Sequence, residues 1–196
     1  MRPSEEDGIL AARAKSGDGQ AFEELVSRHG RRIYNVVLRM VHGDREEAED
    51  LTQEVLLRAY QALPGFREES GFYTWLYRIA VNRTLNRLQR KKLAVRSLDE
   101  PLTDEDGERP RELPDASGDP QAVYAHRELA RALERSLDQL NQTSRAVFVL
   151  REVEGMSHEQ IALVLGSTSQ AVRVRLHRAK KELMRLLSPW LAEGRS

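Results

Sequence analysis

The sequence predicts an all-α protein built from two small helical domains. Apolar residues recur at helical spacing over residues 6–93 and again over residues 122–187. No segment shows the sustained apolar and polar alternation that is typical of a strand. A chain of 196 residues is long enough to form two compact cores of modest size.

A change in composition separates the two predicted domains. Residues 94–121 contain nine acidic residues and four prolines. Such a segment buries too little apolar surface to offset the entropy that is lost when a chain becomes ordered. We therefore expect one domain over residues 1–93, a flexible acidic linker over residues 94–121, and a second domain over residues 122–196.

Within the first domain, the spacing predicts a helix from about Asp44 to Leu63. Its inward stripe consists of Ala48, Leu51, Val55, Ala59 and Ala62. Its outer face combines charge with an exposed leucine, through Asp50, Gln53, Glu54 and Leu57. Because a merely solvated face normally lacks such a leucine, this pattern favours docking to another protein.

After a turn at Pro64 and Gly65, an aromatic segment leads into a strongly basic one. Residues 72–77 include four aromatic residues, and residues 78–92 include six basic residues and no acid. Successive helical positions are about 100° apart, so we expect some of the aromatic rings to face outward. Exposed rings beside arginines suit single-stranded nucleic acid. An aromatic core followed by a solvated basic tail explains the same pattern, and the loop over residues 63–70 could hold a flipped base.

Within the second domain, residues 157–173 predict a helix, a turn and a second helix. Ser157 and Gln160 can form a capping box, Gly166 can end the first helix, and Ser169 can cap the next. The second helix has an apolar stripe made of Val172, Leu176, Ala179 and Leu183, and we expect Pro189 to stop the helix after Leu187. Its other face is polar and basic, which suits a helix that reads the major groove of DNA. A plain helical hairpin with a solvated basic face is the alternative.

The net charge of zero conceals an uneven distribution of charge. The 31 basic and 31 acidic residues include six acids and one base within residues 44–54, and six bases and one acid within residues 173–185. One acidic face and two basic faces indicate at least two kinds of partner.

Several classes of function are excluded or disfavoured. The chain contains no cysteine, which excludes disulfides, thiolate metal sites and cysteine nucleophiles. Its five histidines lack ligand spacing, and no phosphate-binding glycine loop or nucleophile motif is present. We therefore expect no enzyme activity and no catalytic, cofactor or metal site. No apolar stretch is long enough to span a membrane and no signal peptide is evident, so we expect a cytoplasmic location.

Three segments together resemble one protein family. They are Asp50-Leu51-Thr52-Gln53-Glu54-Val55, the stretch from Phe72 to Asn82, and the stretch from Arg145 to Ser157 with the helix-turn-helix after it. In this order, they resemble the extracytoplasmic-function (ECF) RNA polymerase sigma factors of the sigma-70 family, particularly RpoE-like members that respond to envelope stress. The resemblance implies sigma region 2 in the first domain and sigma region 4 in the second.

The resemblance also implies partners and contact residues. Region 2 would dock on the β′ clamp helices of core RNA polymerase through Asp50, Leu51, Gln53 and Glu54. It would capture and melt the minus-ten element of the promoter through Phe66, Ser70, Phe72, Tyr73, Trp75, Arg78, Asn82, Arg83 and Asn86. Region 4 would contact the β flap and read the minus-thirty-five element through Ser169, Gln170, Arg173, His177 and Arg178. An anti-sigma factor is the expected regulator.

The function predicted from the sequence is therefore that of a dissociable subunit that gives RNA polymerase its promoter choice. With zero net charge, the free chain should bind DNA weakly, because nonspecific affinity depends on the number of phosphates neutralised. A stand-alone helix-turn-helix regulator that binds duplex DNA without polymerase is the main alternative. An adaptor that binds only protein is a third possibility.

Overall fold

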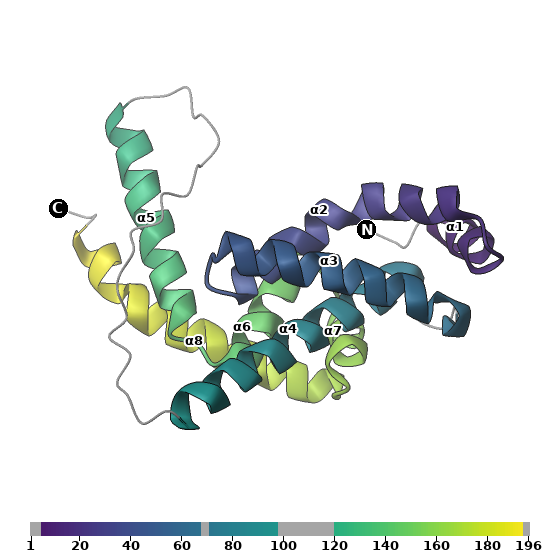
Figure 1. Cartoon of the computed structure of the whole chain (residues 1–196). Helices are drawn as coiled ribbons and strands as arrows, with labels where there is room; N and C mark the ends of the chain where they lie inside the picture. The colour runs from purple at the N-terminus through teal and green to yellow at the C-terminus, as the bar shows by residue number, and fades with distance from the viewer. Residues whose placement is uncertain (1–4, 68–70, 98–119, 194–196) are drawn as a thin grey trace.

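The structure is a computed structural model that describes residues 5–67, 71–97 and 120–193. Every regular element in these ranges is a helix, which confirms the predicted fold class (Figure 1). The linker predicted over residues 94–121 falls largely on residues 98–119, which lie outside the described ranges. The neighbouring helices extend slightly into the predicted linker on both sides.

The N-terminal unit consists of four helices that follow one another through short connections. They are α1 (Glu5–Lys15), α2 (Gly19–Met40), α3 (Arg45–Ala62) and α4 (Gly71–Ser97). Asp44 caps α3 by accepting a hydrogen bond from the backbone N–H of Glu47, as the predicted start of this helix requires. A 3-10 helix over Leu63–Gly65 forms the predicted turn, and Leu63 takes the last core position while Ala62 is exposed.

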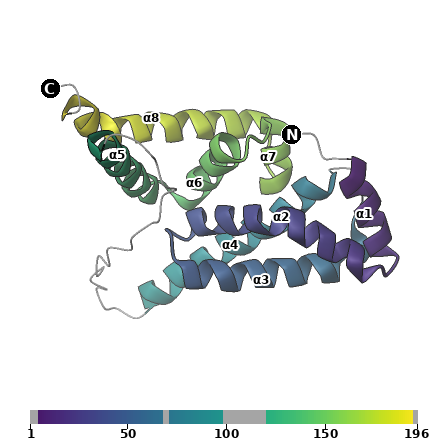
Figure 2. The same ribbon diagram turned by 90° about the horizontal axis from the view of Figure 1, so that it is seen from above.

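The C-terminal unit is arranged along one long helix. It contains α5 (Pro120–Asp138), α6 (Gln142–Phe148), a π-helical turn (Val149–Val153), α7 (His158–Leu165) and α8 (Ser169–Glu193). Figure 2 shows α8 extending along one side of the molecule, with α6 and α7 between it and the N-terminal unit.

The end of α8 differs from the prediction, because the helix continues past Pro189 to Glu193. Proline cannot donate the backbone hydrogen bond that the carbonyl of Arg185 would normally receive. The hydroxyl of Ser188 donates to that carbonyl instead, at 2.8 Å. The ring of Trp190, one residue later, lies 5.2 Å from the guanidinium carbon of Arg135 in α5, which ties the extended end to a neighbouring helix.

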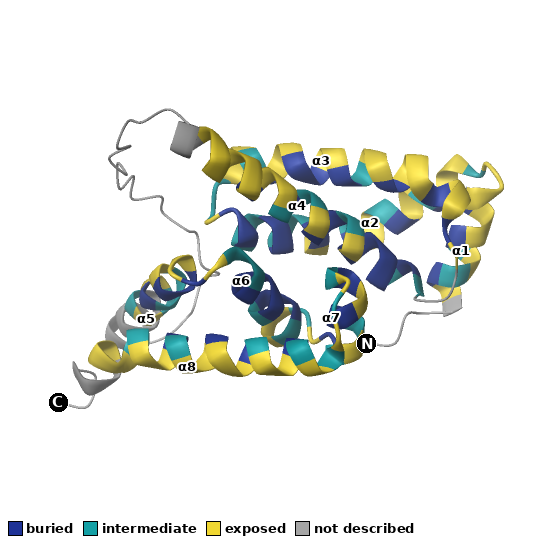
Figure 3. Ribbon diagram, turned by 90° about the horizontal axis from the view of Figure 1, so that it is seen from below, coloured by how far each residue is buried: buried dark blue, intermediate teal, exposed yellow. Residues whose placement is uncertain are grey.

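The two helical units share one hydrophobic core. Buried residues of α2, α3 and α4 form a continuous cluster with Ala146, Val147, Leu150, Ile161, Val164 and Val172 of the C-terminal unit. A second, smaller cluster lies between α5 and α8, with Leu137, Leu140, Ala179 and Leu183. Figure 3 shows buried residues on the sides of α4, α6 and α7 that face the interior. The units are therefore packed together, so α4 is covered from two directions.

Candidate nucleic-acid interface

One face of α3 places acidic side chains beside exposed apolar ones. Asp50, Gln53 and Glu54 are exposed, as the sequence predicts. Leu57 and Tyr60 continue the same helical stripe with 59% and 54% of their surfaces accessible. We call these five residues the docking face.

Leu51 does not belong to the docking face. It is only 2% exposed and lies in the core with Ala48, Val55 and Ala59. The assignment of Leu51 to a protein-binding surface is therefore corrected, because its side chain stabilises the helix that carries that surface.

Two aromatic residues of α4 form a buried cluster with one from the preceding turn, inside the N-terminal unit. The rings of Phe66, Phe72 and Trp75 pack with centroids 5.0 to 5.9 Å apart. All three side chains are buried. In this arrangement they hold the start of α4 against the turn that precedes it, and none presents a free face to a nucleic-acid base.

The other two aromatic residues at the start of α4, Tyr73 and Tyr77, face the C-terminal unit. Tyr77 donates a hydrogen bond to Glu154 Oε2 at 2.7 Å, and Tyr73 donates to the same oxygen at 3.3 Å. Tyr77 is buried and Tyr73 is partly buried. The expectation that some of the four rings face outward is therefore wrong for this arrangement. A single core face could not bury all four rings, but α4 is covered on one side by its own unit and on another by the C-terminal unit.

The environment of the two tyrosines keeps their hydroxyl groups protonated. Burial raises the pKa of Tyr77 far above its ordinary value of 10.0, and the neighbouring Tyr73 and Glu154 raise it further. Burial likewise raises the pKa of Tyr73. A protonated hydroxyl is the form that can donate to Glu154, so these hydrogen bonds persist at neutral pH.

Farther along α4, the polar residues predicted to contact DNA remain accessible. Arg78, Asn82 and Asn86 are exposed, whereas the Arg83 side chain is only 20% accessible. Ser70, predicted to contact the same element, lies outside the described residues.

Acidic residues of α3 pair with basic residues of α4. Glu54 Oε2 accepts a hydrogen bond from Arg83 Nε at 2.6 Å. Glu47, whose side chain is 10% exposed, accepts from Arg87 at 3.1 Å and from Lys91 at 2.8 Å. Although burial alone would raise it, these two cations hold the pKa of the Glu47 carboxyl below its ordinary value. The acidic and basic blocks of the sequence therefore partly neutralise each other.

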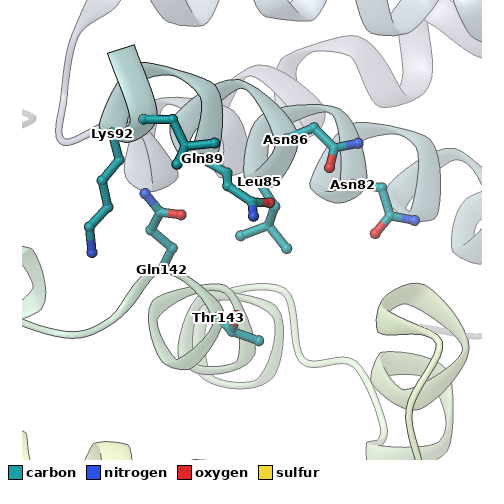
Figure 4. Close-up of a pocket in the computed structure, with 8 residues that line it drawn as sticks. Asn82, Leu85, Asn86, Gln89, Lys92, Gln142 and Thr143 are labelled. Atoms are coloured by element: carbon teal, nitrogen blue, oxygen red, sulfur yellow. The ribbon is translucent and has the colours of Figure 1, made fainter. Parts of the chain in front are cut away.

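A cavity of about 710 Å³ lies between α4 and α6, where the two units meet. Its lining includes Asn82, Asn86, Gln89 and Lys92 from α4, and Gln142 from α6. Figure 4 shows the side chain of Gln142 directed toward α4, near Gln89 and Lys92. Two of the residues predicted to contact DNA thus border a polar cavity whose far wall belongs to the C-terminal unit.

The helices α7 and α8 form the predicted helix-turn-helix. Ser157 and Gln160 make both hydrogen bonds of a capping box. Gly166 adopts the left-handed conformation with φ of 59° and ends α7. The cap of α8 is displaced by one residue from the prediction, because the hydroxyl oxygen of Thr168, rather than that of Ser169, accepts from the backbone N–H of Ala171.

Helix α8 has one buried side and one exposed polar side. Its predicted apolar stripe is buried throughout, at Val172, Leu176, Ala179 and Leu183. The residues predicted to contact DNA lie elsewhere on the helix: Gln170, Arg173, His177 and Arg178 are exposed and Ser169 is partly exposed. Arg173 approaches Glu159 only loosely, at 3.7 Å, and both side chains remain more than half accessible. The basic side of the helix is open in this arrangement.

Arg145 of α6 connects the two units, although the sequence reasoning gave it no role. Its side chain is buried and donates to the backbone carbonyl of Arg39 in α2 and to Asp138 in α5. It also lies 3.1 Å from Nδ1 of His42, which in turn lies 2.9 Å from Asp138. Burial alone would raise the pKa of Asp138, but His42 and Arg145 hold it below its ordinary value.

Arg145 and Glu154 were not predicted as contacts, for different reasons. A charge directly before the apolar run from Ala146 to Leu150 is a signal that could have identified Arg145, since buried charges need partners. Glu154 resembles any exposed acid in sequence, and only the packing of α4 shows that it receives two tyrosine hydroxyls.

In the described parts of the chain, no group of three or more histidine, aspartate or glutamate residues is placed to hold a metal ion. None of the described helices is both long and apolar enough to cross a membrane.

Comparison with known proteins relates the two units to known sequence families. Residues 25–93 match the family "Sigma-70 region 2", and residues 130–183 match "Sigma-70, region 4". The chain is 37% identical over 197 residues to the RNA polymerase sigma-H factor of Pseudomonas aeruginosa, covering 99% of this chain and 100% of that protein. It is 34% identical over 184 residues to the ECF RNA polymerase sigma-E factor of Escherichia coli, covering 93% and 95%.

Two solved structures share the fold. CnrH, determined in complex with the cytosolic domain of CnrY, is 31% identical with a TM-score of 0.68, over 94% of this chain and 99% of that chain. RpoE of Bartonella quintana, determined with the anti-sigma factor NepR, has a TM-score of 0.68 at 20% identity, over 85% and 96%.

The order of the two matches agrees with the geometry. Region 2 covers the docking face and α4 except its last turn, and region 4 covers α7 and the part of α8 up to Leu183. Sigma factors are non-enzymatic transcription initiation factors, which confirms the prediction that the chain is not an enzyme. The chain belongs to the ECF sigma factors of the sigma-70 family, close in sequence to the sigma-E and sigma-H factors, and carries regions 2 and 4.

Proposed function

We propose that this sigma factor docks on core RNA polymerase through the docking face of α3 and reads the minus-thirty-five element through α8. The observation that carries the proposal is the division of α8 into a buried apolar stripe and an open polar side. Glutamine and arginine can bind base edges in the major groove with two hydrogen bonds, and arginine and lysine farther along can contact phosphates. Gln170 and Arg173 are suited to the first role, and Arg178 and Lys181 to the second.

The bases of the minus-ten element are proposed to stack on α4 once the C-terminal unit has moved away. Tyr73 and Tyr77 are engaged by Glu154, and Asn82 and Asn86 border the cavity that α6 closes. A single strand needs open ring faces on which its bases can stack. We therefore assign the packed arrangement to the free chain and a separated arrangement to the promoter complex.

The partners follow from these roles. The acidic and apolar character of the docking face fits a basic surface with apolar contacts, such as the proposed β′ clamp helices. The β flap is the proposed contact of region 4, and both partners place the chain in the cytoplasm. CnrH has been determined with the cytosolic domain of CnrY, and RpoE of Bartonella quintana with the anti-sigma factor NepR, which supports an anti-sigma factor as the proposed regulator of this chain.

Run-off transcription with purified core polymerase and a promoter library tests the proposal. Wild-type chain should direct initiation at a defined subset of promoters. Asp50→Lys should weaken core binding at least tenfold with unchanged helical content, because it reverses a charge on the docking face. Glu23→Lys, the same change of charge at an exposed position of α2, is the matched control.

Two results would contradict the proposal. The first is absence of polymerase-dependent initiation from every template. The second is tight binding of the free chain, as a dimer, to palindromic duplex DNA, which would identify a stand-alone regulator.

A further inference from the structure

A second, smaller pocket lies on the surface between α3 and α4 and is rich in arginine. Its volume is about 350 Å³, and its polar lining consists of Arg58 from α3 with Arg78, Asn82, Arg83, Asn86 and Arg90 from α4. Four guanidinium groups and two carboxamides surround it, and no acidic residue lines it. We call this feature the arginine pocket. Arg58 and Arg90 belong to it although neither was predicted to contact DNA.

Three of the four arginines in the pocket have no carboxylate partner among the described residues. Arg58, Arg78 and Arg90 are exposed and form no ion pair there. Such a concentration of unneutralised positive charge is unfavourable unless an anion binds. Guanidinium groups bind phosphate through paired hydrogen bonds, and carboxamides can donate to and accept from sugars and base edges. This combination fits a nucleotide phosphodiester better than an isolated carboxylate.

The fourth arginine is held by the docking face. Arg83 pairs with Glu54, whose side chain remains 47% accessible while that of Arg83 is 20% accessible. Glu54 therefore belongs both to the surface proposed to meet polymerase and to an ion pair with a residue of the arginine pocket. A cation that approaches Glu54 weakens its attraction for Arg83, and a phosphate that approaches Arg83 weakens the attraction in return. Such coupling is reciprocal, so each binding event favours the other.

We propose that the arginine pocket binds a backbone phosphate of single-stranded promoter DNA, and that the Glu54–Arg83 pair weakens this binding until polymerase engages Glu54. The proposal rests on the proposed function of the chain as a sigma factor and adds Arg58 and Arg90 to its DNA contacts. It also provides a direct link between polymerase docking and DNA capture, because the two proposed surfaces share one ion pair.

The test uses the full-length free chain, because the arginine pocket is open while the two units are packed together. Binding of a fluorescent 12-nucleotide oligothymidine is followed by anisotropy at several salt concentrations. Glu54→Gln should raise the affinity about three- to tenfold and steepen the salt dependence by about one phosphate contact. Asp50→Asn is the matched control, because it removes the same charge from the docking face. Asp50 has no ion pair among the described residues, so its effect on the affinity should stay below about twofold.

A second pair of variants tests whether Arg58 and Arg90 of the arginine pocket contribute to DNA binding. Arg58→Ala and Arg90→Ala should each weaken oligonucleotide binding several-fold. Arg45→Ala, at the other end of α3, is exposed and should have little effect. Circular dichroism establishes that each variant keeps its helical content.

Three outcomes would overturn the proposal. Equal oligonucleotide affinities of Glu54→Gln and Asp50→Asn would show that the ion pair does not weaken DNA binding. Equal affinities of Arg58→Ala and Arg45→Ala would show that the arginine pocket is not the DNA-binding site. Full competition by millimolar inorganic phosphate, with no dependence on oligonucleotide length, would identify a site for free phosphate. A wild-type chain that still directs run-off transcription in these cases would leave the proposed function intact, so the two failures are distinguishable.

Discussion

The two helices proposed to contact the promoter differ in what covers them. Helix α8 packs along one side only, so the residues proposed to read bases lie open to solvent. Helix α4 packs on two sides, against its own unit through Phe72 and Trp75 and against the C-terminal unit through Tyr73 and Tyr77. Region 4 is thus ready to bind DNA as it stands, whereas Tyr73 and Tyr77 of region 2 must first lose their contact with region 4 before bases can stack on them.

The difference originates in the amino-acid patterns of the two helices. In α8, the apolar residues recur at spacings of three and four and leave the basic residues on the remaining surface. In α4, four aromatic residues fall within residues 72–77 and therefore point in several directions. A second packing partner is the way to bury them all, and the C-terminal unit supplies that partner.

The largest expected effect comes from locking the two units together. Gln89→Cys and Gln142→Cys place one thiol on each side of the cavity in a chain that has no other cysteine. A thiol-cleavable bismaleimide that joins them should reduce promoter-specific initiation more than a hundredfold, because Tyr73 and Tyr77 stay covered by the C-terminal unit. Cleavage of the linker should restore initiation.

Each single-cysteine variant, treated with the same reagent, is the control for that experiment. Undiminished initiation by the crosslinked chain would show that separation of the units is unnecessary, and the contrast between α4 and α8 would lose its functional meaning.

Removal of the buried arginine between the units should have the next largest effect. Arg145→Ala leaves the Arg39 carbonyl without this donor and Asp138 with His42 alone, and we expect it to lower the free energy of unfolding by about 2–4 kcal/mol. Urea denaturation measures the change. Arg131→Ala, which removes an exposed arginine paired within its own helix, should cost less than about 0.5 kcal/mol. Similar losses in the two variants would contradict the role assigned to Arg145.

A change on the open helix should affect specificity without affecting the fold. Arg173→Ala should reduce the discrimination between preferred and altered minus-thirty-five elements by about 1–3 kcal/mol, if this arginine binds a base edge. Lys181→Ala should weaken binding to all sequences alike, because a phosphate contact carries no sequence information. Holoenzyme binding to a set of single-base promoter variants separates the two results, and an unchanged sequence preference in Arg173→Ala would exclude base reading by this residue.

The smallest expected effect concerns alkaline pH and the covered tyrosines. The pKa values of Tyr73 and Tyr77 are raised above 10.0 in the folded chain, so above pH 10 the unfolded chain loses protons that the folded chain retains. The contribution of these two tyrosines to the free energy of unfolding is therefore constant below pH 10. Above it, the free energy of unfolding should fall, by about 1 kcal/mol by pH 11. The double variant Tyr73→Phe/Tyr77→Phe should lose less stability over the same pH interval. An identical loss in both proteins would show that other groups dominate.

The helix-turn-helix was the part of the molecule most accessible to sequence reasoning. The capping box, the glycine at the end of α7 and the buried stripe of α8 all depend on residues close together in the chain. The predicted end at Leu187 was wrong, because the Ser188 hydroxyl and the contact of Trp190 with Arg135 compensate for Pro189. The sequence identifies Pro189 as a helix breaker, but it does not indicate the tertiary contacts that let the helix continue past this residue.

The surface of region 2 was less accessible to sequence reasoning. The acidic and basic blocks were recognised as separate faces, but their pairing across α3 and α4 depends on how these two helices pack. The burial of Leu51 followed from its place on the inward stripe, whereas family resemblance alone put it on the surface. The contact of Glu154 with two tyrosines joins residues far apart in sequence, and neither helical periodicity nor charge patterning indicates it.

The distance between the two units is the measurement that tests the account most directly. Gln61→Cys in α3 and Met184→Cys in α8 place donor and acceptor dyes at exposed positions of a chain without other cysteines. Single-molecule energy transfer should show one population for the free chain and a shift to lower efficiency when core polymerase is added. An efficiency that is the same in the free chain and in a holoenzyme that initiates at its promoters would contradict the proposal that region 4 covers region 2 until polymerase binds.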